Sequence, residues 1–182
     1  MPPEAKMVFK GKIFEVWQWQ QQVFDGTVRT FERLKRPDTV EIFAIVGDKI
    51  CVHDEQQPDS GEFVTMPAGR VEPGEEPLPA AKRELLEETG YTSDDWQLAG
   101  EEMPSGKIEW TIHIFVARNC RKKQEPNPEP GEKILSRLVS FDELLSLCDD
   151  PKFRSTATRF LLWRARLDEK RKEELRALLF KE

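Results

Sequence analysis

Residues 77–89 constrain this chain more than any other segment, because they combine a strong helix signal with crowded like charges. They read PLPAAKRELLEET, with prolines suited to a first turn, an apolar side, and Gly90 placed to end the helix. Glu84, Glu87 and Glu88 fall three and four positions apart, so their carboxylates share one face. Such a cluster destabilises a bare helix. A divalent cation that also binds substrate phosphates would offset the repulsion.

A solvated acidic face is the plainer interpretation of an isolated run of glutamates. The flanking residues favour a functional interpretation, because Gly69 and Gly90 permit unusual backbone turns on either side of the helix. Glu75 in the preceding loop and Arg83 on the helix are spaced to pair with each other. We therefore expect a braced loop and helix that hold a cation.

The composition narrows the class of protein. The chain has 182 residues and a formal net charge of −6, so it lacks the basic surface of a nucleic-acid binder. No segment resembles a signal peptide or a membrane span, and we expect a cytoplasmic protein. The three cysteines are far apart and predict buried free thiols. His53 and His113 lie in strand-like patterns with no ligand partner at useful spacing, so we expect structural roles for both.

Strand and turn patterns flank the helix on both sides. Residues 7–35 predict a strand-rich piece with a hairpin turn at Asp25-Gly26, and 39–46 predict a central strand. Residues 108–119 have the period and composition of one further strand. Ser140 and Glu143 predict a capping box, and the tail from about 155 to 180 predicts helix. The chain is therefore expected to be a mixed α/β protein.

The segment from 69 to 91 resembles the Nudix box, in which fixed residues are spaced over 23 positions. Every fixed position is matched, by Gly69, Glu75, Arg83, Glu84, Leu85, Glu87, Glu88, Gly90 and Tyr91. The preceding Pro-Ala-Gly and the Arg-Pro-Asp run at 36–38 are similar to the branch of the family that cleaves ADP-ribose and nucleoside diphosphate sugars.

The resemblance implies an α/β/α sandwich around a mixed sheet, with an amino-terminal antiparallel strand extension. Residues 1–36 would form this extension and contribute to a homodimer, and residues 37–182 would form the hydrolase domain.

The resemblance also implies roles for the residues of the box. Glu84 and Glu88 would be the principal ligands of Mg²⁺, for which Mn²⁺ could substitute. Glu87 would bind a further ion or its water, and the carbonyl of Ala68 would complete the ligand set. Glu87 and Arg83 belong to the catalytic machinery, Arg83 as a brace for the loop.

A glutamate on a loop well after the box serves as general base in this branch. Glu132, just before an expected strand, is our choice. Glu125 and Glu129 share its loop, and Glu109 lies on an earlier strand, so these three remain alternatives.

The substrate contacts are expected in the flanking segments. Gln57 stands where ADP-ribose enzymes of this branch place an arginine, and Pro104 belongs to a Pro-Ser-Gly run whose order differs from theirs. Thr65 replaces a common glutamate. The arginines expected to contact phosphate or ribose are Arg29, Arg33 and Arg70.

The expected activity is Mg²⁺-dependent hydrolysis of a nucleoside diphosphate sugar, such as ADP-ribose or GDP-mannose, to a nucleoside monophosphate and a sugar phosphate. The expected partners are this small substrate and a second copy of the chain, without nucleic acid or membrane. Two alternatives are a housecleaning nucleoside triphosphate hydrolase and a Nudix-fold module that senses nucleotide sugars without cleaving them. Loss of box glutamates would be expected of the sensor, and here all are present.

Overall fold

A mixed sheet organises the computed structural model, which describes residues 1–58 and 60–181. The strand order is β13-β5-β4-β11-β9, with β6 beside β5 and β7 beside β4. Strand β11 runs parallel to β4, and the other neighbours in this sheet are antiparallel. The strands are β4 (Thr39–Val46), β5 (Lys49–Gln57), β6 (Gly61–Thr65), β7 (Ala68–Arg70), β9 (Asp95–Glu102), β11 (Ile112–Arg118) and β13 (Lys133–Val139).

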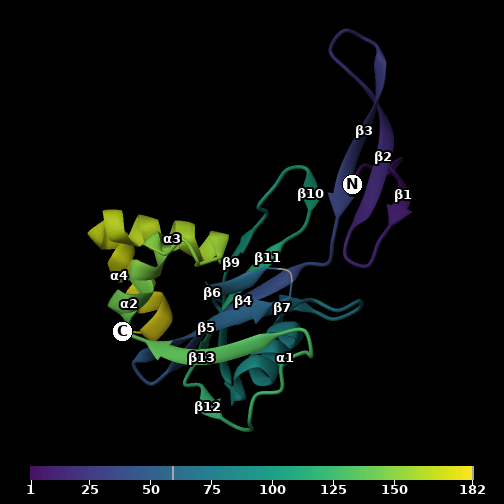
Figure 1. Ribbon diagram of the computed structural model, residues 1–182. Helices are drawn as coiled ribbons and strands as arrows, with labels where there is room; N and C mark the ends of the chain where they lie inside the picture. The colour runs from purple at the N-terminus through teal and green to yellow at the C-terminus, as the bar shows by residue number, and fades with distance from the viewer. Residues whose placement is uncertain (59, 182) are drawn as a thin grey trace.

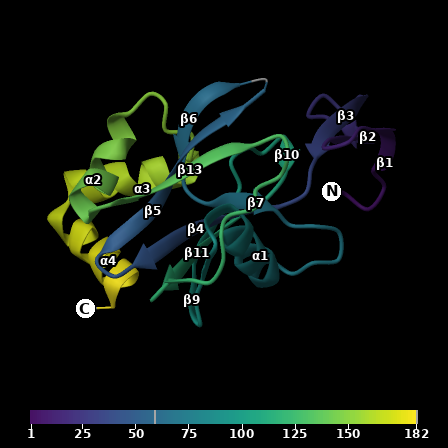
Figure 2. The same cartoon turned by 60° about the horizontal axis from the view of Figure 1, so that its bottom comes forward.

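Alternation along β4 explains why both faces of this sheet are covered. Val40, Ile42 and Ala44 pack on one face with helix α1 (Pro77–Thr89), whereas Phe43 and Ile45 belong to the core on the other face. Three helices cover that second face: α2 (Phe141–Ser146), α3 (Thr156–Leu167) and α4 (Glu169–Phe180), with a short 3₁₀ turn over Leu147–Asp149. Figures 1 and 2 show α1 and these helices on opposite sides of the sheet. The predicted α/β/α sandwich is confirmed.

The amino-terminal strands form a separate sheet with the order β1-β2-β3-β10. It contains β1 (Lys6–Lys10), β2 (Glu15–Gln22), β3 (Val28–Lys35) and β10 (Ile108–Glu109). Gly26 lies in the turn between β2 and β3 with φ of 83°, as its predicted hairpin requires. Figure 1 shows this sheet projecting from the main body.

The predicted strand over 108–119 is in fact two strands that belong to different sheets. β10 pairs with β3, and β11 pairs with β4 and β9. Between them, Trp110 donates to the Thr39 hydroxyl and the Thr111 amide donates to Asp38. The alternating pattern continues through the junction, so it could not reveal the change of partner.

The predicted helical tail likewise divides into two helices at Asp168. This residue has an extended backbone, and its carboxylate accepts from the Lys170 and Arg171 amides to begin α4. The predicted capping box of Ser140 and Glu143 is present at the start of α2.

The remaining elements are small. Strand β8 (Tyr91–Thr92) directly follows α1 in the chain. It pairs with β12 (Arg121–Lys122). Cys51, Cys120 and Cys148 are buried free thiols, as expected. Within the described residues, no helix is both long enough and apolar enough to cross a bilayer.

Candidate active site

Helix α1 is positioned by its apolar side and by its carboxyl end. Ala80, Ala81 and Leu85 are fully buried against the sheet. Gly90 ends the helix with φ of 70°, and its amide donates to the Leu86 carbonyl. Any Cβ at Gly90 would overlap the Gln124 carbonyl oxygen, so only glycine fits this close approach. The helix is therefore fixed with its glutamates toward β7.

Arg83 braces the loop before the helix, as predicted. Its guanidinium donates to Glu75 at 2.9 and 3.2 Å and to the Arg70 carbonyl at 2.9 Å. It also donates to Glu84 at 2.8 Å and to Glu87 at 3.2 Å. The Arg83 side chain thus links the loop to two of the three box glutamates on the helix, Glu84 and Glu87.

Glu84 lies directly against the backbone of β7. A Cβ built on Gly69 would overlap the Glu84 carboxylate, so the glycine provides the space that the glutamate occupies. Burial raises the pKa of Glu84, and the Arg83 guanidinium partly opposes this shift.

Glu88 is the most deeply buried of the three box glutamates on the helix, with 5% of its surface exposed. Its carboxylate accepts from the Ala68 amide at 3.0 Å. Burial, followed by the charge of Glu84, raises the pKa of Glu88 well above its usual range. His53 is buried beside it, with Nδ1 3.7 Å from a Glu88 oxygen, although no spacing in the sequence indicated this contact.

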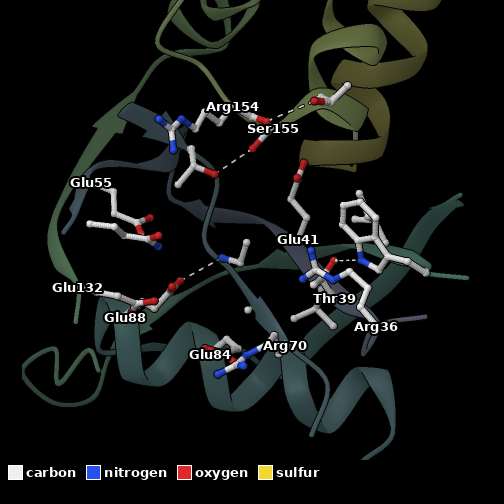
Figure 3. A pocket seen from close by; sticks show the side chains of 18 of the residues that line it. Arg36, Thr39, Glu41, Glu55, Arg70, Glu84, Glu88, Glu132, Arg154 and Ser155 are labelled. Atoms are coloured by element: carbon white, nitrogen blue, oxygen red, sulfur yellow. Dashed lines mark hydrogen bonds between the residues drawn. The ribbon is translucent and has the colours of Figure 1, made fainter. Parts of the chain in front are cut away.

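A cavity of about 600 Å³ opens over these residues and is lined by Glu84, Glu88, Ala68 and Gly69. Figure 3 shows Glu55, Glu88 and Glu132 along one side and Arg36 and Thr39 along the other. Arg154 and Ser155 lie near α3 at its far end. Carboxylates and guanidinium groups therefore face a common space.

Glu132 lies in the cavity wall, where burial and the charges of Glu55 and Glu129 raise its pKa. Glu129 also lines the cavity. The other two alternatives lie elsewhere, because Glu125 is 92% exposed and Glu109 is bound by the amino terminus and by Lys35 at 3.2 Å.

The predicted substrate contacts divide between two regions. Gln57, Arg70 and Pro104 line the cavity. Arg29 and Arg33 are on β3 in the amino-terminal sheet and do not line it, and the Arg33 guanidinium lies over Trp19 at 5.8 Å. Glu87 is also absent from the described lining.

Several residues that line the cavity were not singled out from the sequence. Arg36 lies over the Trp110 ring at 4.4 Å, Trp110 donates to the Thr39 hydroxyl at 3.1 Å, and all three residues line the cavity. Glu41 interrupts an apolar strand, which is the signal that could have identified it, and its buried carboxylate accepts from Thr158. Glu55 accepts from Gln57 at 2.7 Å.

The chemistry of the donor set fits a hard divalent cation, although the described side chains do not form a ready metal site. No group of three or more His, Cys, Asp or Glu side chains among the described residues is arranged to hold an ion. The Arg83 guanidinium forms ion pairs with Glu84 and Glu87. Glu88 is buried near the Glu84 carboxylate, and among the described residues it has no guanidinium or ammonium partner. Buried carboxylates that raise one another's pKa values are stabilised by a cation.

Comparison with known proteins agrees with this arrangement. The family model described as "NUDIX domain" matches residues 35–163. A methanol dehydrogenase activator of Bacillus methanolicus is 26% identical over 160 residues, which cover 85% of this chain and 86% of that protein. An ADP-ribose pyrophosphatase of Bacillus subtilis strain 168 is 26% identical over 168 residues, or 90% of this chain and 91% of that protein. A crystal structure of an ADP compounds hydrolase superimposes with a TM-score of 0.73 at 24% identity, covering 92% of this chain and 94% of that one, which shows a shared fold.

Proposed function

We propose that this chain, which belongs to the NUDIX domain family and is a Nudix hydrolase, hydrolyses the diphosphate of nucleoside diphosphate sugars. The reaction would require Mg²⁺. Water would attack one phosphorus and the bridging P–O bond would break, which yields a nucleoside monophosphate and a sugar phosphate. ADP-ribose and GDP-mannose are representative substrates.

One observation carries the proposal. Glu84 and Glu88 share a single cavity with Glu55 and Glu132, and Arg36, Arg70 and Arg154 also line it. A diphosphate is drawn to arginine but repelled by glutamates unless a cation lies between them. A cavity lined by both glutamates and arginines therefore suits a diphosphate that enters with a bound metal ion.

Glu84 and Glu88 would hold the ion, with Glu87 and the Ala68 carbonyl as further ligands. When bound, the ion neutralises the diphosphate and makes a water more acidic. Glu132 would accept the proton of the attacking water, and its raised pKa suits this role because a base works best near the operating pH. Arg83 would keep the loop and helix in register through Glu75.

Arg70, Gln57 and Pro104 would contact the substrate, as their position in the cavity suggests. Arg36 and Trp110 offer a cationic and an aromatic surface for a base or sugar. Arg29 and Arg33 could reach substrate only from a second copy of the chain. We accordingly propose a cytoplasmic homodimer in which residues 1–36 form the dimer extension and 37–182 the hydrolase domain.

A test of this function is a hydrolysis screen with ADP-ribose, ADP-glucose, UDP-glucose and GDP-mannose, with Mg²⁺, Mn²⁺ or EDTA. The proposal predicts release of a nucleoside monophosphate in the presence of metal and none with EDTA. Preferential cleavage of nucleoside triphosphates in the same screen would instead favour a housecleaning enzyme.

A regulatory protein is the second candidate, because one relative is named an activator. Retention of Glu84, Glu87 and Glu88 favours turnover over sensing alone. Tight binding of a nucleotide sugar without cleavage of any diphosphate would support the regulatory candidate.

A further inference from the structure

A buried polar pair lies beneath the box carboxylates. His53 on β5 is fully buried and pairs in register with Ser136 on β13. Both ring nitrogens of His53 and the Ser136 hydroxyl lack hydrogen-bond partners within the described residues. Each unsatisfied buried polar group destabilises the folded protein, whereas an apolar residue would fill the same space without that cost.

The direction in which His53 faces suggests why the cost is tolerated. Its Nδ1 lies 3.7 Å from Glu88 Oε2, which is longer than the roughly 2.7–3.2 Å of a formed N–H···O hydrogen bond. The same oxygen accepts from the Ala68 amide at 3.0 Å. A small movement of either side chain would let a second donor hold this carboxylate.

The burial of the imidazole is consistent with this geometry. Burial lowers the pKa of His53 to about 4, so the ring is neutral in the folded protein at neutral pH and carries one N–H. An arginine here would neutralise Glu88 and compete with a metal ion. A neutral donor orients the carboxylate and leaves its negative charge for the cation.

Ser136 lies opposite His53 on the neighbouring strand, although no hydrogen bond joins the two side chains in the structure. Directly opposed residues in antiparallel strands place their Cβ atoms roughly 4.5–5.5 Å apart, which brings the hydroxyl near the imidazole. Donation from Ser136 to Nε2 would fix the tautomer in which Nδ1 bears the proton.

We propose that His53 is a positioning residue for Glu88, donating its Nδ1–H to the carboxylate when Glu88 binds a divalent cation, with Ser136 holding the tautomer. This rests on the proposed function, because it requires that Glu88 binds metal. Carboxylate ligands are themselves commonly held by hydrogen bonds, and loss of such a partner typically costs about 10–100-fold in metal affinity.

Two amide substitutions separate the two ring nitrogens. His53→Asn places an N–H close to the position of Nδ1, whereas His53→Gln places it close to Nε2. We expect His53→Gln to weaken Mn²⁺ binding to the substrate-free protein by about 10–100-fold. Affinity in His53→Asn should remain within about threefold of the original. Free Mn²⁺ is measured by electron paramagnetic resonance, and His113→Gln, on a different strand, should leave the affinity unchanged.

Equal Mn²⁺ affinity in His53→Gln, His53→Asn and the unmodified protein would overturn the proposal, provided that Glu88→Gln loses binding in the same assay. If both His53 variants lose affinity together with thermal stability, a purely structural role would be indicated and the proposal would also fail. Failure of the unmodified protein to bind Mn²⁺ would overturn the proposed function itself, and is distinct from either result.

Discussion

Glu132 is the residue whose chemical role depends most on its surroundings. Its pKa is raised by burial and by the charge of Glu55, which makes its carboxylate a stronger base than an exposed one. We expect Glu132→Gln to lower kcat by about 10²–10⁴-fold with little change in Mn²⁺ affinity.

Two further glutamate variants test whether Glu132 is the general base. Glu125→Gln, at an exposed position on the same loop, should retain the full rate. Glu55→Gln tests the neighbouring carboxylate in the cavity. A larger loss of kcat in Glu55→Gln than in Glu132→Gln would contradict the assignment of the base.

Glu41 should contribute a pH-dependent cost to stability. Burial raises its pKa in the folded protein, and the hydrogen bonds from Thr158 and Ser155 only partly oppose this. Below about pH 4 the carboxyl is neutral in both states, so no cost arises. As the pH rises, the Glu41 carboxyl loses its proton at a lower pH in the unfolded chain than in the folded protein. The free energy of unfolding therefore falls.

Glu41→Gln removes this titration and keeps an acceptor for Thr158. The variant should therefore have the same thermal midpoint as the unmodified protein near pH 4 and a higher one at pH 8. Each kcal/mol gained would raise the midpoint by about 2–4 °C. An equal difference at both pH values would show that the effect is packing and not ionisation.

At the residue scale, the sequence predicted the arrangement of residues that lie close together in the chain, but few of the contacts between segments that are distant in the chain. Glu84, Glu88 and the Glu75–Arg83 brace follow from spacing within one loop and helix. His53 meets Glu88 only because β5 lies beside α1 in the fold, and its own neighbours in the sequence carry no sign of that contact.

At the scale of the elements, the packing of β7 against α1 includes a close approach between the Gly69 backbone and the Glu84 carboxylate. An alanine methyl at Gly69 would overlap the Glu84 carboxylate and displace it. We expect Gly69→Ala to reduce kcat/KM by about 10²-fold, because small displacements of a ligand or substrate are costly to catalysis.

The matched control for this substitution is Gly100→Ala in β9, where an added Cβ meets nothing within 4 Å. It should retain activity, and both variants should remain folded by circular dichroism. Full activity in Gly69→Ala would mean that Glu84 does not need its present position.

Element boundaries were predictable where a local signal exists. Helix α1 has the predicted bounds, Pro77–Thr89, because prolines and Gly90 define its ends. The division between β10 and β11 was missed, because it arises from pairing with two different sheets and not from a local breaker. The division at Asp168 was also missed, although aspartate is a common amino-terminal helix cap.

For the whole molecule, the projecting amino-terminal sheet is the basis for the expected homodimer. Its edge strand β1 leaves Met7, Val8 and Phe9 exposed, a pattern that favours association. We expect a dimeric mass by light scattering, and we expect Phe9→Glu to weaken the dimer by at least about tenfold, the equivalent of 1.4 kcal/mol.

Leu167→Glu is the control for that prediction. Leu167 is 88% exposed at the end of α3, in a different part of the molecule, so its substitution should not alter the mass. A monomeric unmodified protein at micromolar concentration would remove the role assigned to residues 1–36.

The most direct test of metal-dependent diphosphate hydrolysis is the rate of AMP formation from ADP-ribose as Mg²⁺ is titrated, for the unmodified protein and for Glu88→Gln. Glu88 is buried beside Glu84 in the cavity, so its neutral amide should lower the rate by several powers of ten while the fold is retained. We expect AMP and ribose phosphate in equal amounts, none with EDTA, and almost none from Glu88→Gln. AMP formation that is insensitive to EDTA, or an unchanged rate in Glu88→Gln, would contradict the account.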